Sequence, residues 1–71
     1  MDYRQQAIKW ASKQIQEGIT GPIKINAWET IENPALYLET NIQRIQHASH
    51  REQRIAYMRI RNLKQKINEH K

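Results

Sequence analysis

The chain has 71 residues, no cysteine and a formal net charge of +5 at pH 7. A chain of this length forms one small domain whose hydrophobic core adds little net stability, and the lack of cysteine excludes disulfides and cysteine-ligated zinc. No segment approaches the roughly 18 apolar residues of a transmembrane helix, and the N-terminus lacks the apolar core of a signal peptide. We therefore expect a soluble, cytoplasmic protein.

The positive charge is concentrated at the C-terminal end. Residues 1–50 contain five basic and five acidic side chains, whereas residues 51–71 contain seven basic and two acidic ones. Such an asymmetry favours an anionic partner, such as nucleic acid or a membrane surface. A solvated helix face that is kept soluble by its charge is an equally good interpretation.

The first predicted element is a helix over residues 2–17. Its apolar side chains recur at helical spacing, and Gly18 follows them as a stop signal. These apolar side chains are Tyr3, Ala7, Ile8, Trp10, Ala11 and Ile15.

Residues 18–33 are predicted to form an irregular connector. Gly21-Pro22 is a strong turn signal, and the alternation at Ile23 and Ile25 indicates a short extended piece that cannot form a sheet alone. Asn26 and the glutamate three residues later have the spacing of a capping box. This spacing predicts one short helical turn that directs Trp28 into the core.

The clearest boundary is Asn33-Pro34, because asparagine is a good N-cap and proline is favoured at the first helical position. From Leu38 to Ile67, mostly apolar residues then form a stripe, in which eight steps of three or four residues cover 29 positions. The average step is close to the 3.6-residue period of a straight helix. No glycine or proline interrupts it. We therefore favour one helix over residues 34–70; the alternative is a break at residues 47–50.

The predicted fold is all-α and consists of a single helical domain over residues 1–71. At about 1.5 Å per residue, the first helix spans about 24 Å and the long amphipathic helix about 50 Å. The short helix can fold back antiparallel over only the first half of the long one. The second half would then keep an apolar stripe without a partner in its own chain.

An uncovered apolar stripe favours burial against another chain. The leading hypothesis is therefore a small, non-enzymatic interaction or accessory protein that forms a homo-oligomer, such as a homodimer, or binds a larger protein partner. The predicted partner-binding residues are Ala56, Tyr57, Ile60, Leu63 and Ile67.

The alternative hypothesis is a dimeric nucleic-acid-binding regulatory protein that places basic side chains on phosphates. The residues predicted for this role are Arg51, Arg54, Arg59, Arg61, Lys64 and Lys66. The apolar residues between them argue against a helix that reads a DNA groove. A helix lying on a membrane surface is less favoured, since the stripe is narrow and contains neither Trp nor Phe.

The sequence contains no pattern that predicts catalysis. It has no glycine-rich phosphate loop and no cysteine nucleophile, and its serine and threonine hydroxyls have no acid and base at a matching spacing. His47 and His50 are one helical turn apart but lack a third ligand nearby, which is more typical of surface histidines than of zinc ligands. We expect no enzymatic activity, metal, cofactor or small-molecule substrate.

Overall fold

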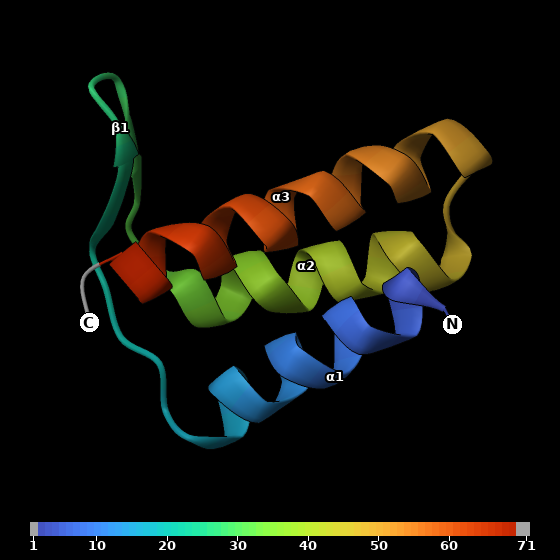
Figure 1. The fold of residues 1–71 in the computed structure, drawn as a ribbon, viewed down its shortest axis with the longest axis horizontal. Helices are drawn as coiled ribbons and strands as arrows, with labels where there is room; N and C mark the ends of the chain where they lie inside the picture. The colour runs from blue at the N-terminus through green and yellow to red at the C-terminus, as the bar shows by residue number, and fades with distance from the viewer. Residues whose placement is uncertain (1, 70–71) are drawn as a thin grey trace.

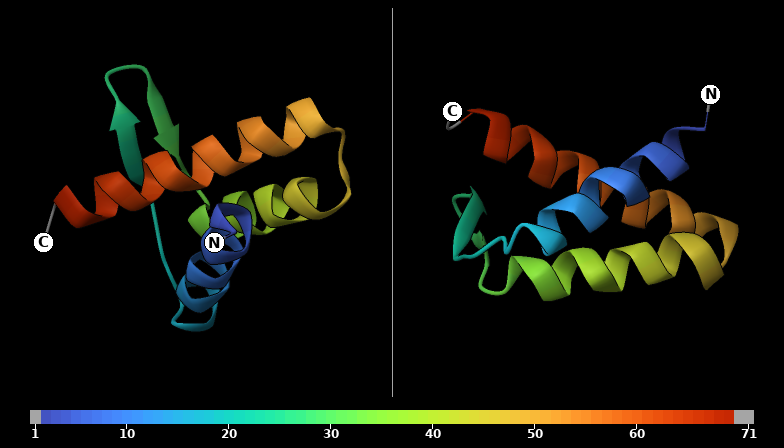
Figure 2. Two further views of the ribbon diagram at one scale, coloured as in Figure 1. Left: turned by 45° about the vertical axis from the view of Figure 1, so that its right-hand side comes forward. Right: turned by 90° about the horizontal axis from the view of Figure 1, so that it is seen from below.

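In the computed structural model, which describes residues 2–69, the chain forms three α-helices and one β-hairpin (Figure 1). The elements are α1 (Tyr3–Gln16), β1 (Ile23–Asn26), β2 (Glu29–Ile31), α2 (Pro34–His47) and α3 (His50–Glu69). α2 and α3 lie side by side in opposite directions, and α1 lies across both at an angle (Figure 2). The all-α prediction is therefore right in outline, but it missed a small antiparallel sheet.

Local capping interactions account for the helix starts and for the end of α1. The Asp2 carboxylate accepts a hydrogen bond from the backbone N–H of Arg4 at 3.0 Å, and the Asn33 side-chain oxygen accepts one from Leu36 at 3.1 Å. Gly18 follows α1 with a φ of +78°, a conformation that glycine adopts without steric cost. These boundaries agree with the predicted helix over residues 2–17 and with the predicted start at Asn33-Pro34.

The single long helix predicted over residues 34–70 is wrong. The backbone of Ala48 is extended, with a ψ of 177°, and the chain reverses direction there. The Ser49 hydroxyl then accepts a hydrogen bond from the backbone N–H of Glu52 at 3.4 Å, so it caps the start of α3. The break at residues 47–50 that we considered as the alternative is the structure observed.

The reversal brings α3 back along α2, and all three helices share one core with β2. The buried apolar residues of this core are Ala11, Ile31, Leu38, Ile45, Ala56, Ile60 and Leu63. Residues Ala56, Ile60 and Leu63 are at most 1% exposed, although we expected them to lack cover within the chain. That expectation is wrong, because it depended on an unbroken helix that would project away from α1.

The connector forms a hairpin rather than a helical turn. β1 and β2 pair antiparallel, with Ile23 opposite Ile31. The Asn26 side-chain oxygen accepts a hydrogen bond from the backbone N–H of Trp28 at 3.1 Å, which is an Asx-type turn at the hairpin tip and not a helix cap. Trp28 is 87% exposed because this tip projects from the core, so its predicted burial is wrong.

The chain approaches itself closely just before the hairpin. A Cβ atom on Gly21 would lie 2.7 Å from Cδ of Pro34 and 2.8 Å from the carbonyl oxygen of Glu32. Glycine therefore lets the segment leading into β1 pack against the start of α2. Within residues 2–69, no helix is both long enough and apolar enough to cross a membrane.

Candidate functional site

The structure places most of the predicted partner-binding residues inside the fold. Ala56, Ile60 and Leu63 belong to the core, and Ile67 is partly buried against it. Tyr57 is also partly buried, but its side chain lines a surface groove. In this fold the stripe is therefore a packing surface, and two members of the set, Tyr57 and the buried Ile60, also line that groove.

The six predicted nucleic-acid-binding residues do not form one patch. Arg54, Arg61 and Lys64 line hollows on the side of α3 that faces α1, whereas Arg59 lies in hollows on the side that faces α2 and the hairpin. Arg51 is exposed at the start of α3. Lys66 has its ammonium nitrogen 3.4 Å from a carboxylate oxygen of Glu69, and a surface ion pair of this kind adds little stability.

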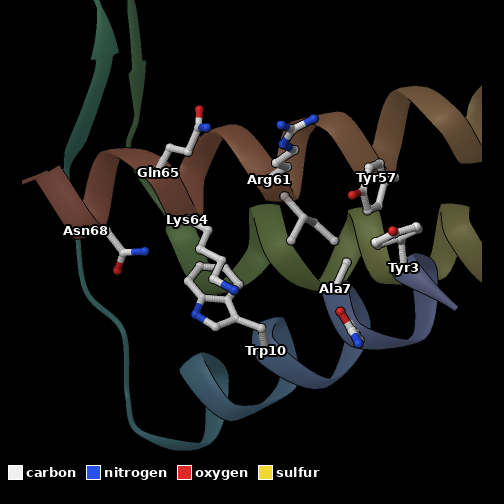
Figure 3. A pocket seen from close by; sticks show the side chains of 10 residues that line it. Tyr3, Ala7, Trp10, Tyr57, Arg61, Lys64, Gln65 and Asn68 are labelled. Atoms are coloured by element: carbon white, nitrogen blue, oxygen red, sulfur yellow. The ribbon is translucent and has the colours of Figure 1, made fainter. Parts of the chain in front are cut away.

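A groove of about 280 Å³ lies between α1 and α3 (Figure 3). The side chains that line it from α1 are Tyr3, Gln6, Ala7 and Trp10, and those from α3 are Tyr57, Ile60, Arg61, Lys64, Gln65 and Asn68. The groove thus combines three aromatic rings, two cations and three amides. Among the residues that the structure describes, no carboxylate lines it.

A second hollow of about 210 Å³ continues this groove toward the start of α3. Its lining residues are Tyr3, Arg4, His50, Arg54 and Tyr57, so the two tyrosines border both hollows. We call the two hollows together the α1–α3 seam. In the described part of the chain, residues 2–69, no acidic side chain lines either half of the seam.

The contribution of α3 to the seam comes from one face of the helix. Its members follow one another at spacings of three or four residues: His50, Arg54, Tyr57, Arg61, Lys64 and Asn68. Residues at these spacings lie in one row along an α-helix. This row runs beside the buried stripe and could have been found in the sequence. On α1, Tyr3, Ala7 and Trp10 have the same kind of spacing, but nothing in the sequence shows that they face this row.

Two polar contacts connect α1 with α3 along the seam. The Lys64 ammonium lies 5.9 Å from the centre of the Trp10 ring, within the range of a cation–π interaction. Nearer the start of α3, Nη1 of Arg4 donates a hydrogen bond to Oε1 of Gln53 at 2.6 Å. Among residues 2–69, neither cation forms an ion pair, so both charges remain available to an anionic ligand.

The opposite side of α3 differs chemically from the seam. There a hollow of about 440 Å³ is lined by Arg44 and Arg59 but also by Glu29 and Glu32. Burial raises the pKa of Tyr37 in this hollow, while nearby Arg59 lowers it and Glu29 raises it. Because charges of both signs line it, this hollow does not select for anions.

The same hollow contains a buried amide. The side-chain nitrogen of Asn41 donates a hydrogen bond to the carbonyl oxygen of Tyr37 at 2.8 Å, but the side-chain oxygen has no protein partner among residues 2–69. An ordered water can satisfy such an oxygen. The amide is therefore explained without a larger ligand.

No three histidine, cysteine, aspartate or glutamate side chains come together to hold a metal ion within residues 2–69. His47 ends α2 and His50 starts α3, and both are exposed. The two histidines therefore flank the chain reversal. The prediction had assumed that they lie on one continuous helix, and they do not.

Comparison with known protein families matches residues 18–69 to one family, described as a domain of unknown function (DUF6965). No curated protein and no solved structure matches the chain. The matched residues include the hairpin, α2 and α3 but not α1. Since the match covers more than half of the sequence, the chain belongs to the DUF6965 family.

Proposed function

We propose that this protein is a small, non-enzymatic nucleic-acid-binding protein that contacts phosphates with the cations of the α1–α3 seam. The observation on which the proposal rests is the lining of this seam. Arg4, Arg54, Arg61 and Lys64 border it, and no carboxylate of residues 2–69 does. Cationic side chains that are exposed and not already paired with acids can be neutralised by phosphates, and this releases counterions from the nucleic acid.

The dimensions of the seam suit a short stretch of nucleic acid backbone. From Arg54 to Lys64, the row on α3 extends about 15 Å at 1.5 Å per residue. A strand with its bases stacked rises about 3.4 Å per nucleotide along its axis, so more than one phosphate can lie along that length. Arginine is well suited to these contacts, since its planar guanidinium can bind two phosphate oxygens at once.

The proposal can be tested by reversing charge on the two sides of α3. The seam variant is Arg61→Glu with Lys64→Glu, and the matched control is Arg44→Glu with Arg59→Glu, which changes the net charge equally on the other face. Fluorescence anisotropy with labelled oligonucleotides over a series of salt concentrations gives both affinity and salt dependence.

We expect the seam variant to bind at least about tenfold more weakly than the control, with the slope of log affinity against log salt reduced by about two. The control should lose affinity only through its lower net charge. Equal losses in the two variants would contradict the placement of the site. An affinity of the native chain weaker than about 0.1 mM at physiological salt would contradict nucleic-acid binding altogether.

A protein-interaction role is the second candidate, at a different surface from the one that the sequence suggested. Leu36 is 57% exposed and Ile55 is 43% exposed, and they border adjoining hollows that share Arg44 and Arg59. An exposed apolar patch with a polar rim is typical of protein-binding surfaces. If this surface pairs two copies of the chain, Leu36→Asp should convert a sedimenting dimer into a monomer; a native chain that sediments only as a monomer would exclude the homodimer.

A further inference from the structure

The α1–α3 groove contains more aromatic surface than phosphate binding requires. Tyr3, Trp10 and Tyr57 all line it, next to Arg61 and Lys64 (Figure 3). Tyr3 is 65% exposed, so packing in the core does not account for its presence at this position. Trp10 and Tyr57 are partly buried, yet both present part of their rings to the groove. Phosphates alone would need only the cations.

The groove is also concave and has an apolar floor. Ile60, which is 1% exposed, and Ala7 line the groove together with the aromatic rings. A volume of about 280 Å³ lies near the lower limit of small-molecule pockets, which is about 300 Å³. A duplex keeps its bases stacked in its interior, whereas the unstacked base of a single strand can enter such a groove and stack on aromatic side chains.

We infer that the seam binds single-stranded nucleic acid, with a base in the groove beside Trp10 and Tyr57 and the adjoining phosphates on Arg54 and Arg61. This inference rests on the proposed function and adds the strandedness of the ligand. The base takes the place of the Lys64 ammonium over the Trp10 ring, because stacking of a base is stronger than a cation–π contact at an exposed site. Lys64 then turns to a phosphate.

The polar rim of the groove indicates that several kinds of base are accepted. Gln6, Gln65 and Asn68 line it, and a side-chain amide both donates and accepts hydrogen bonds. Such groups can pair with the edge of any of the bases. Stacking is tolerant of sequence in the same way, since every base has an aromatic face.

Trp10 itself can report on the bound base. The other tryptophan, Trp28, lies at the exposed hairpin tip, so Trp28→Phe leaves Trp10 as the single fluorescent tryptophan without altering the groove. In this background we would titrate the protein with three ligands of equal length: a single strand, the matching duplex, and an abasic strand that keeps the phosphates but lacks the bases. Single strands of both DNA and RNA should be used.

We expect the single strand to quench Trp10 and to bind about tenfold more tightly than either the duplex or the abasic strand at equal salt. Tyr57→Leu, which keeps an apolar side chain against the core, should lower single-strand affinity toward that of the abasic strand. The matched control is Tyr37→Leu on the opposite face, which should not change it. Tyr3→Ala removes an exposed ring and should also weaken single-strand binding, so the test does not depend on the folding of one variant.

The outcomes separate this inference from the proposed function. If the protein binds all three ligands equally, with affinity that falls as salt is raised and with no quenching of Trp10, phosphate binding stands and the inference is overturned. Unchanged single-strand affinity in both Tyr57→Leu and Tyr3→Ala also overturns it. If no ligand binds more tightly than about 0.1 mM at physiological salt, the proposed function fails and the inference fails with it.

Discussion

Replacing Leu63 with alanine should remove a large part of the stability of this protein. Leu63 lies on α3 in the core that α1 and α2 also form, and none of its surface is exposed. A buried Leu→Ala substitution costs about 2–5 kcal/mol, because it removes apolar contacts and leaves a cavity. At about 0.05–0.15 kcal/mol per residue, the 71 residues have a free energy of unfolding of about 4–11 kcal/mol. The variant should therefore be marginally stable.

Urea unfolding followed by far-UV circular dichroism measures this loss, and Met58→Ala provides the matched control. Met58 lies on the same helix but is 40% exposed, so its loss should be about 0.5 kcal/mol. Equal losses in the two variants would refute the intramolecular packing described above.

Two further predictions concern Tyr37 and the start of α3. Burial raises the pKa of Tyr37 above its ordinary value of 10.0. The folded state therefore holds the phenolic proton more tightly than the unfolded state does. The resulting stabilisation is present below about pH 10 and is lost as the pH rises through the raised pKa. Tyr37→Phe should therefore flatten the fall of Tm at high pH, and an identical fall in both proteins would contradict this. Ser49→Ala should lower the free energy of unfolding by about 0.5–2 kcal/mol, whereas Ser49→Asp should stay close to the native value. Thermal melts in which the two variants behave alike would argue against the cap.

The sequence predicts those parts of the fold that depend on a few neighbouring residues. The caps at Asp2 and Asn33 act within one helical turn, and both helix starts were predicted. The break at Ala48 was considered but not preferred, because the apolar period continues in phase across it and Ala48 is neither glycine nor proline. The break is favoured by tertiary packing, since reversal buries Ile60 and Leu63, which a straight helix would leave in water.

The candidate site was predictable only in part for the same reason. Arg54, Arg61 and Lys64 were identified because they flank the stripe on one helix. Trp10 was read simply as part of the apolar face of its own helix, and nothing in the sequence pairs it with Tyr57 across nearly fifty positions. Trp28 shows the opposite error: an apolar side chain suggested burial, but strand pairing places it at an exposed tip.

α1 lies outside the family match, and this limits which properties of the protein can be inferred for its relatives. The matched residues 18–69 supply the buried face of α3 and its cationic row, whereas Tyr3 and Trp10 come from a helix that precedes them. A property that depends on those two rings is therefore not implied by membership of the family. A homologue that resembles this protein only over the matched residues has no counterpart of those two rings, and its ligand has to be determined separately.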